Sequence, residues 1–390
     1  MASDALHEVL LLLERLVKYD TQNPPRAISG HPAEGGIFPF IMGALGPSFT
    51  SSVTDLGDGC VSLLAVRGAP SLLFNVHLDT VPRDPGWRRD PFDLNVDGER
   101  AVGLGAADIK GAAACLIAAA RRTNGALALL FTSDEEAGSS RCVKQFLEGK
   151  HGFRGVIVGE PTQCRAVLEH RGIATAIAEF SGTAGHASAA RALVDSAVHE
   201  AVRWGARALA FAEAREARRY KSLAGVRFNL GLVNGGIKAN MIASTATVRF
   251  GVRPLPDERP EALLAELEEL AERPDRARFT PGFLAPPLPA PLAEGGSAGA
   301  APGDAVTKRV AEAASLAEEL ALPLGEPVDF WTEASLFSAS GLPAIVYGPG
   351  NIREAHTAGE WVALSELAEA EGAYRRLLGG GDGPIAAAGR

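Results

Sequence analysis

The chain has 390 residues, of which 46% are hydrophobic, and its formal net charge at pH 7 is −9. Because this length exceeds one typical hydrophobic core, we expect two domains. The negative charge argues against nucleic acid or an anionic membrane surface as the main partner. The four cysteines have no Cys-x-x-Cys spacing, which is typical of a protein in the reducing cytoplasm.

The N-terminal segment MASDALHEVLLLLERLVKYD predicts an amphipathic helix over residues 5–19. It lacks the basic start and the small-residue cleavage site of a signal peptide. No uninterrupted apolar run of the sequence is long enough to span a bilayer, so we expect no membrane partner. A loop rich in proline and glycine follows over residues 21–36, and the helical pattern resumes in IFPFIMGALG.

The next part of the chain alternates apolar strands with helical patterns. We expect strands at 51–55, 60–67, 71–78, 126–136 and 154–162, and an alanine-rich helix entered from a loop within 98–122. Polar residues stand where several of these strands end. Such alternation predicts an α/β sheet with its functional site at the carboxyl edge of the strands.

The pattern changes near residue 172. The segment GIATAIAEFSGTAGHAS alternates like an antiparallel strand, and further strands are expected at 226–236 and 244–254, with helices at 191–220 and 257–273. This predicts a small sheet-and-helix domain over 172–283, inserted into a catalytic domain made of 1–171 and 284–390. A Pro/Gly/Ala connector is expected at 279–304, followed by a helix at 304–321, a strand in PAIVYGPG and a closing helix at 364–378.

One strand end carries the first chemical signal. The run SLLFNVHLDTVP presents His77 and Asp79, which point to the same face because residues two apart in a strand do so. A metal-binding imidazole usually needs an oxygen that orients its ring, although Asp79 is close in sequence for that purpose. Taken alone, the pair favours the ordinary interpretation of a polar loop after a buried strand.

Five potential metal ligands lie at strand ends or in glycine-bounded loops: His77, Asp108, Glu136, Glu160 and His356. Each has an ordinary alternative. These are a helix N-cap for Asp108, a solvated helix start for the acid pair containing Glu136, a loop acid for Glu160, and an exposed or helix-capping residue for His356. Together, two imidazoles and three carboxylates suit zinc, with cobalt or manganese also acceptable.

The ligand count fits two metal ions. His77 and Glu160 would hold one ion, Glu136 and His356 the other, and Asp108 would give one oxygen to each. Two ions bridged in this way can share a water molecule and lower its pKa. Glu135, next to a ligand, is then the natural general base for that water and for the leaving amine.

The segment GLGAADIKG also resembles a dinucleotide-binding fingerprint. However, Asp108 stands where the third glycine should be, and no acid about twenty residues further on ends a second strand as the motif requires. We therefore do not expect nucleotide binding.

Six segments in order, FNVHLDTVP, GLGAADIKGAAA, SDEEAGSS, VGEPT, GTAGHAS and EAHTAGE, resemble the zinc-dependent family of acetylornithine deacetylase, succinyl-diaminopimelate desuccinylase, aminoacylase and glutamate carboxypeptidase. The resemblance implies a mixed-sheet, zinc-exopeptidase-like α/β catalytic domain. It also implies that a ferredoxin-like α+β lid interrupts this domain and dimerises. It assigns the five ligands to Zn²⁺, one or two per subunit, with Co²⁺ as an alternative. It further implies that Asp79 backs the first ligand, that Glu135 is the general base, and that His186 stabilises the oxyanion, often across a dimer interface.

Other segments bear on the substrate. NPPRAI, AEGGIF, GGIKANMIA and VDFWTEASLFS are similar to the branch of the family that deacetylates N-acetyl-L-citrulline in a variant arginine pathway. Arg253 matches a position that grips a substrate carboxylate, for which a guanidinium fork is suited. Lys238, Asn240 and Glu333 are further candidate substrate contacts. The alternatives are an N-acetyl-L-ornithine deacetylase, a dipeptidase or desuccinylase, and a binding protein without catalysis.

Overall fold

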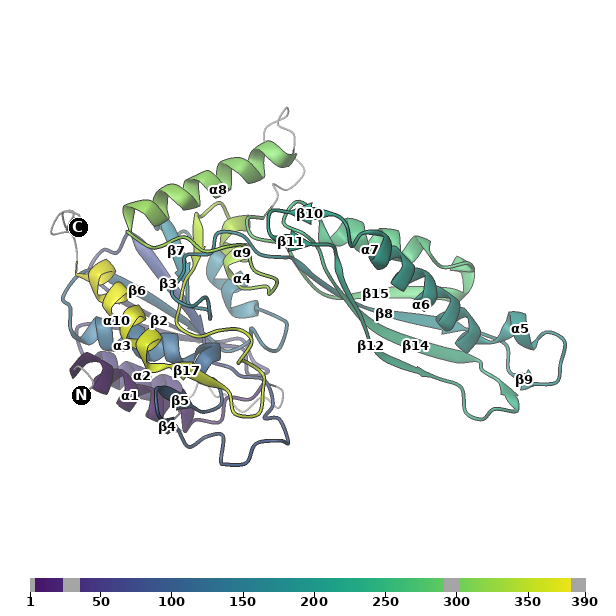
Figure 1. The fold of residues 1–390 in the computed structure, drawn as a ribbon, viewed down its shortest axis with the longest axis horizontal. Helices are drawn as coiled ribbons and strands as arrows, with labels where there is room; N and C mark the ends of the chain where they lie inside the picture. The colour runs from purple at the N-terminus through teal and green to yellow at the C-terminus, as the bar shows by residue number, and fades with distance from the viewer. Residues whose placement is uncertain (1–3, 24–35, 291–301, 380–390) are drawn as a thin grey trace. The chain divides into compact units, whose positions relative to one another are not determined.

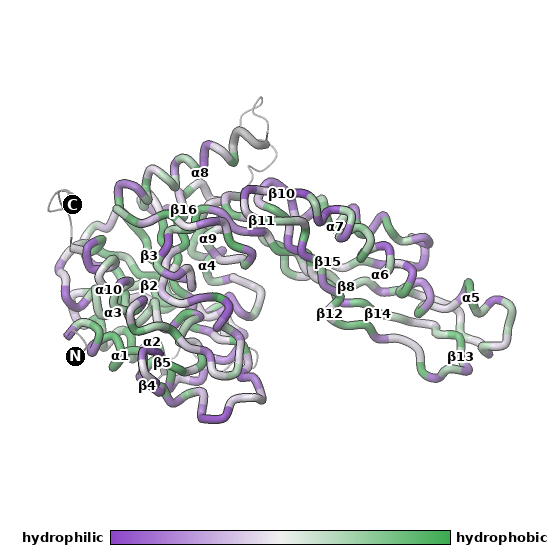
Figure 2. The backbone as a smooth tube through the Cα atoms, viewed as in Figure 1, coloured by the Kyte–Doolittle hydropathy of each residue, from purple (hydrophilic) through white to green (hydrophobic). Residues whose placement is uncertain are grey.

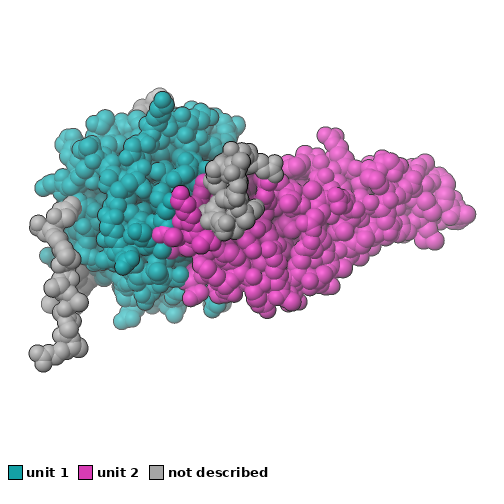
Figure 3. All heavy atoms as spheres, turned by 90° about the horizontal axis from the view of Figure 1, so that it is seen from above, with its two compact units in different colours: residues 1–167, 312–325, 332–390 teal, residues 168–311, 326–331 magenta. Residues whose placement is uncertain are grey.

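The structure is a computed structural model that describes residues 4–23, 36–290 and 302–379. Most of the predicted loop 21–36, the later part of the connector 279–304 and the C-terminal tail lie outside these residues. The chain divides into two compact units (Figure 3), unit 1 with residues 1–167, 312–325 and 332–390, and unit 2 with residues 168–311 and 326–331. The role of unit 2 as a lid stays a prediction.

Unit 1 is built on a six-stranded mixed sheet of order β1-β2-β6-β3-β7-β16. Its strands are β1 (Thr50–Asp55), β2 (Val61–Arg67), β3 (Leu72–His77), β6 (Leu127–Thr132), β7 (Gly155–Val158) and β16 (Ala344–Val346). The central strands β6, β3, β7 and β16 run parallel, whereas β1 and β2 are antiparallel additions at one edge. The predicted α/β sheet is confirmed.

Every residue of β3, β6 and β7 is buried, so both faces of this sheet are covered, as is usual for parallel strands. The helices of unit 1 are α1 (Asp4–Val17), α2 (Ile37–Leu45), α3 (Gly111–Arg121), α4 (Arg141–Leu147), α9 (Ala334–Ala339) and α10 (Leu364–Leu378), and α8 (Pro302–Glu319) crosses the boundary of the units. Alanine-rich α3 is packed against α1, α2 and α10 (Figure 1). Figure 2 shows its predominantly apolar composition.

A small three-stranded sheet lies beside the helical turn η2 (Ala106–Lys110). It consists of β17 (Trp361–Ala363), β5 (Arg100–Val102) and β4 (Asn95–Asp97), in the order β17-β5-β4. The pairing of β17 with β5 joins the C-terminal part of the chain to the loop that leads into η2. The sequence reasoning missed these three short strands, because three residues are too few to show an apolar alternation.

Unit 2 has the chain order β8 (Ile173–Ser181), α6 (Ala197–Ala214), β12 (Arg227–Gly235), β14 (Thr245–Arg253), α7 (Pro260–Glu269) and β15 (Ala277–Ala285). The strands β8, β12, β14 and β15 form an antiparallel sheet of order β12-β14-β8-β15. This β-α-β-β-α-β arrangement is ferredoxin-like, as predicted. Trp204 of α6 is fully buried among the apolar side chains of this unit, and its indole N–H donates to Leu267 O at 2.8 Å.

Two predicted segments differ from the structure. The beginning of the connector 279–304 is the edge strand β15, which pairs with β8 despite Pro281. The register shifts directly after Pro281, and proline is tolerated at an edge strand and at such irregularities. The long helix expected over 191–220 is the short α5 (Ala192–Asp195) followed by α6, which ends at Ala214. Among the described helices, none has the length and apolar character that crossing a membrane requires.

Candidate functional site

The carboxyl ends of three neighbouring parallel strands present the predicted acids and the first histidine. His77 is the last residue of β3, Glu160 follows the end of β7 by two residues, and Glu135 and Glu136 follow β6. Since parallel strands end at the same edge of a sheet, these side chains converge there. Continuous apolar strands therefore lead directly into a polar site.

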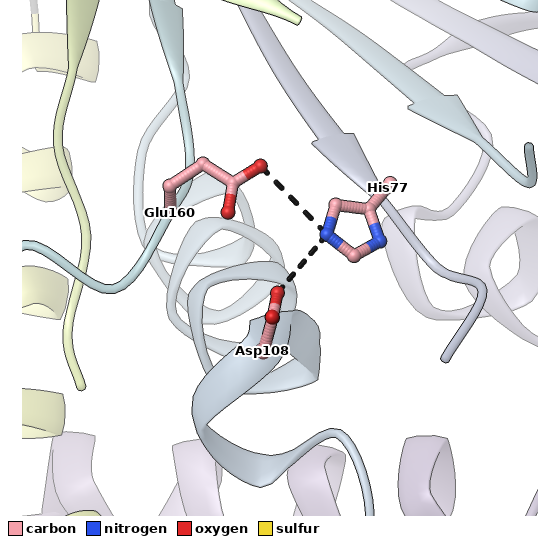
Figure 4. Close-up of side chains that lie close together, drawn as sticks. All are labelled: His77, Asp108 and Glu160. Atoms are coloured by element: carbon pink, nitrogen blue, oxygen red, sulfur yellow. Dashed lines mark hydrogen bonds and ion pairs between the residues drawn. The ribbon is translucent and has the colours of Figure 1, made fainter. Parts of the chain in front are cut away.

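The first group of side chains consists of His77, Asp108 and Glu160 (Figure 4). His77 Nε2 lies 3.1 Å from Asp108 Oδ1 and 3.7 Å from Glu160 Oε1. The three side chains point toward one another from β3, from η2 and from the segment after β7. All three residues are buried.

The second group consists of Asp108, Glu136 and His356. His356 Nε2 lies 3.1 Å from Asp108 Oδ2 and 2.8 Å from Glu136 Oε1. Asp108 therefore directs one carboxylate oxygen toward each group. His356 is exposed to solvent, whereas Glu136 is half-buried, so the second group is the more accessible of the two.

The donor atoms of both groups fit divalent cations. Two donors that bind one tetrahedral zinc ion at about 2.1 Å lie about 3.4 Å apart. The contacts of 2.8–3.7 Å within the two groups match that spacing. Each group supplies one imidazole and one unshared carboxylate, and Asp108 is shared. The five side chains come together in the division that the sequence predicted, and their binding of metal ions stays a proposal.

The pKa values reflect a buried cluster of opposite charges. Burial alone lowers the pKa of His77, but hydrogen bonds to Asp108 and Asp79 and the charge of Glu160 raise it well above its ordinary value. Hydrogen bonds to Asp108 and Glu136 raise the pKa of His356 to about 11. Burial raises the pKa of Glu160 well above its ordinary value, against the opposite effect of His77. The acids thus stabilise positive charge at both imidazoles, which is the property that a cation site needs.

The ring of His77 is oriented by a backbone carbonyl. Its Nδ1 lies 3.0 Å from Asp79 O and 3.5 Å from Asp79 Oδ1. A carbonyl oxygen only accepts, so Nδ1 carries the hydrogen and donates it. Nε2 is then the nitrogen directed at Asp108 and Glu160, with the tautomer that a metal ligand requires.

The carboxylate of Asp79, unlike its backbone carbonyl, accepts hydrogen bonds from other segments of unit 1. It accepts the backbone N–H of Glu136 at 2.9 Å and of Glu135 at 3.4 Å, and the side-chain amide of Asn23 at 3.4 Å. The Asn23 amide also donates to Ser133 O at 2.9 Å. Asp79 therefore positions the turn that carries the predicted general base. Burial and the charge of Glu136 raise the pKa of Glu135 well above its ordinary value, which suits a group that accepts a proton near neutral pH.

Comparisons with known proteins identify the family. The model of peptidase family M20/M25/M40 matches residues 73–379. The chain belongs to this family. Peptidases of this kind hydrolyse amide bonds, so this M20-family chain is a metal-dependent amide hydrolase.

Two curated relatives of this M20-family chain are similar over most of their length. An N-acetyl-L-citrulline deacetylase from Xanthomonas campestris pv. campestris is 49% identical, with 97% of this chain and 99% of the relative covered. An acetylornithine deacetylase from Myxococcus xanthus is 32% identical, with 83% of this chain and 85% of the relative covered.

Solved structures of M20-family and related proteins share the fold. An aminopeptidase from Bacillus cereus superposes with a TM-score of 0.67 at 17% identity and covers 96% of this chain and 98% of its own. A dinuclear metal-binding M20 peptidase from Bacillus subtilis superposes with a TM-score of 0.58 at 15% identity, covering 96% and 97%. At such identities the comparison bears on the fold alone, which agrees with the predicted class.

Glu333 lies inside unit 1 of the M20-family chain. It is 1% exposed, and its Oε2 accepts the hydroxyl of Thr132, the last residue of β6, at 3.1 Å. Burial, together with the charge of Asp134, raises the pKa of Glu333 to about 8. Its contact with a substrate stays a prediction.

His186 lies in unit 2, in the two-stranded ladder of β9 (Gly185–His186) and β13 (Met241–Ile242). Its side chain is exposed. Its Nδ1 accepts the backbone N–H of Ser188 at 3.2 Å and lies 2.7 Å from the Ser188 hydroxyl. An accepting Nδ1 leaves the hydrogen on Nε2 in the neutral ring. Nε2 is then a hydrogen-bond donor, which is the form that oxyanion stabilisation needs.

The other unit 2 candidates fall into two places. Asn240 O accepts the N–H of Ala187 at 3.0 Å, so exposed Asn240 lies beside the segment of His186. Exposed Lys238 belongs to the turn before Met241, which pairs with His186. Arg253 ends the nine-residue strand β14. Eight steps of about 3.3 Å separate it from Thr245 at the other end. Unit 2 therefore brings His186, Lys238 and Asn240 together, and Arg253 lies far from them.

The sequence reasoning missed three buried residues of unit 1. Asn23 contacts Asp79, as described above. Lys110 is fully buried, its Nζ donates to Tyr19 O at 2.9 Å, and burial lowers its pKa to about 7. Glu360 accepts backbone N–H groups of the Asp108 loop. Its position four residues after His356, directly before a strand, was the available signal.

Proposed function

We propose that the chain is a two-metal deacetylase that hydrolyses N-acetyl-L-citrulline to citrulline and acetate, in a variant route of arginine biosynthesis. The observation that carries the proposal is the pair of ligand groups joined by Asp108, in a chain 49% identical to an N-acetyl-L-citrulline deacetylase over nearly its full length. His77 and Glu160 would hold one ion, Glu136 and His356 the other, and Asp108 both.

Different residues of the chain would transfer the proton, position the general base and bind the substrate carboxylate. When bound, two divalent cations polarise the acyl carbonyl and lower the pKa of a water molecule. Glu135 accepts the proton of that water and returns it to the leaving amine. Asp79 holds Glu135 through its backbone N–H, and Arg253 binds the substrate carboxylate as a guanidinium fork.

His186 donates from Nε2 to the oxyanion that forms on the acyl group. For one protomer this raises a geometric question, because His186 and Arg253 lie toward opposite ends of unit 2. A symmetric homodimer through unit 2 would resolve it, with one protomer supplying Arg253 and its partner supplying the histidine. The exposed apolar side chains Leu232 and Val233 of the edge strand β12 support such an association.

Alternative substrates are distinguished by the charge of their tail. Citrulline ends in a neutral ureido group and ornithine in an ammonium group, so a fixed negative charge in the tail pocket would favour ornithine. Glu333 is a predicted substrate contact, but it is buried in unit 1, and burial raises its pKa to about 8. The preference for citrulline is therefore proposed on the similarity to the N-acetyl-L-citrulline deacetylase, and the substrate comparison tests it.

The test compares four substrates at equal concentration: N-acetyl-L-citrulline, N-acetyl-L-ornithine, a dipeptide and an N-succinyl amino acid. The purified protein is freed of metal with chelator and reloaded with Zn²⁺ or Co²⁺, and bound metal is counted by elemental analysis. We expect two ions per chain, activity that depends on them, and the highest kcat/KM on N-acetyl-L-citrulline. A preference for another of the four substrates refutes the substrate assignment, and full activity without metal refutes the mechanism.

We further propose that the protein works in the reducing cytoplasm. All four cysteines lie among the described residues, where they are buried and form no disulfide, which is compatible with such a compartment. Zn²⁺ is the proposed resident ion, since imidazole and carboxylate donors suit it, and Co²⁺ is the proposed substitute.

A further inference from the structure

We propose that Glu360 is a positioning residue of the candidate metal centre: its carboxylate holds the loop that carries Asp108, so that each oxygen of Asp108 meets its own ligand group. This inference rests on the proposed two-metal function. Glu360 itself belongs to neither ligand group. It would act through Asp108, with no contact to substrate or metal.

The carboxylate of Glu360 accepts three backbone N–H groups. Oε1 accepts the N–H of Ala107 at 2.9 Å and of Asp108 at 3.0 Å, and Oε2 accepts the N–H of Gly105 at 3.0 Å. The residue is 1% exposed. Bonds of this kind to an ionised carboxylate are charge-assisted and about twice as strong as neutral ones.

These N–H groups lie at the entry to η2 and within it, where the backbone of Asp108 is not helical, with φ −125° and ψ 85°, so a regular helical ladder does not supply their acceptors. The loop enters η2 through Gly105, whose φ is +78°. A Cβ there would lie 2.8 Å from Thr80 Cγ2, so the close approach requires glycine. The Glu360 carboxylate is thus the acceptor that determines how this tight loop sits, and Asp108 is the last residue it holds.

Glu360 is held in turn by the neighbouring ladder. Trp361 pairs with Val102 in β17 and β5, and Gly103 N donates to Glu360 O at 3.0 Å. His356 lies four residues earlier in the same loop. One residue therefore ties the segment of Asp108 to the segment of His356, the two members of the second ligand group that are furthest apart in sequence.

Two substitutions can distinguish the hydrogen-bonding role of the Glu360 carboxylate from a role in packing alone. A glutamine retains one accepting oxygen and replaces the other with an NH₂ group that only donates. Glu360→Gln must therefore lose at least one of the three bonds at nearly unchanged volume. Glu360→Asp keeps the charge but withdraws the carboxylate by one methylene. Residues that hold metal ligands in this indirect way typically change metal affinity by about 10- to 100-fold when replaced.

The experiment titrates metal-free full-length protein with Co²⁺ and follows the visible absorption of the bound ion, which reports its coordination. Glu360→Gln and Glu360→Asp are compared with wild type and with Glu371→Gln. Glu371 is a matched control, because it is a buried acid of unit 1 at 2% exposure that pairs with Arg375 on the same helix. Thermal unfolding of each metal-free variant is recorded by circular dichroism.

We expect Glu360→Gln to weaken the binding of one Co²⁺ equivalent by about tenfold or more and to change its spectrum, whereas Glu371→Gln leaves both unchanged. Unchanged Co²⁺ affinity and spectrum in a folded Glu360 variant overturn the proposal, and so does the same change in Glu371→Gln. Failure of both Glu360 variants to fold makes the residue a folding determinant and also overturns it. Wild-type protein that binds no Co²⁺ refutes the proposed function instead, which distinguishes the two failures.

Discussion

The two units bury their sheets differently. In unit 1 the strands β3 and β6 are buried at every residue, whereas β8 and β14 of unit 2 alternate between buried and accessible residues. Unit 1 thus has a sheet covered on both faces, and unit 2 a sheet covered on one face by α6 and α7 (Figure 1).

This difference in burial determines which unit can hold charged side chains close together in a buried site. In unit 1, the ligand candidates His77, Asp108 and Glu160 are buried, so their charges interact strongly in a low-dielectric environment. In unit 2, the candidates His186, Lys238 and Asn240 are exposed to solvent. We infer that unit 1 carries the reaction and that unit 2 contributes contacts at its surface.

Replacing the predicted general base, Glu135, should lower kcat more than any other substitution considered. This variant tests whether the proton transfer takes place in unit 1. Glu135→Ala should lower kcat by about 10³-fold, since general base catalysis contributes about 10²–10⁴, while the metal content stays at the wild-type value. Steady-state kinetics and elemental analysis measure both quantities. The control is Glu148→Ala, an exposed acid after α4. Activity near wild type would exclude Glu135 as the base.

Truncating a core side chain of unit 2 should show that the two units unfold independently of each other. Trp204→Ala removes a fully buried indole and should cost about 3–5 kcal/mol of unfolding free energy, with metal binding retained. Hydrogen exchange with mass spectrometry locates the loss, and Leu209→Ala, on the accessible surface of the same helix, is the control. Equal loss of protection in the strands of unit 1 would show that the units unfold together.

Replacing the predicted oxyanion donor tests whether unit 2 takes part in the reaction. His186→Ala should lower kcat by about 10²–10³-fold, the usual cost of one such donor, without loss of metal. The control is His7→Ala on the exposed side of α1. If the histidine acts across a dimer, mixing unfolded Glu135→Ala and His186→Ala chains and refolding them should restore activity that neither variant has alone. A wild-type kcat in His186→Ala would show that the predicted oxyanion donor of unit 2 takes no part in the reaction.

The smallest expected effect is on how the free energy of unfolding changes with pH. Burial raises the pKa of Glu333 from 4.5 to about 8, so the folded chain keeps a proton that the unfolded chain loses above pH 4.5. Stability therefore falls as pH rises through this window, by at most about 1.4 kcal/mol per pH unit. Glu333→Gln keeps the acceptor for Thr132 and removes this titration.

Urea unfolding of the metal-free protein between pH 5 and 8 checks the expectation. The free energy of unfolding of Glu333→Gln should decline less with pH than that of wild type and of the control Glu369→Gln, an exposed acid on α10. Parallel pH profiles for all three proteins would show that Glu333 titrates at its ordinary value in the folded chain.

The sequence by itself predicted the central strands, the long helices and the identity of the ligand candidates. Local periodicity is sufficient for a helix such as α10, whose bounds Leu364–Leu378 agree with the expected 364–378. Strands followed at once by His77, Glu135 or Glu160 indicated a polar sheet edge, because parallel strands must end together. The shared role of Asp108 followed from counting ligands against two ions.

Only the tertiary structure decided how these side chains are held. Glu360 meets the Asp108 loop from about 250 positions away, and the Asp79 carboxylate receives N–H groups of the acids after β6. The edge strand β15, hidden in a proline-rich segment, forms by pairing with β8. Such bonds join groups far apart along the chain and leave no local period in the sequence. They become visible only when folding brings the partners together.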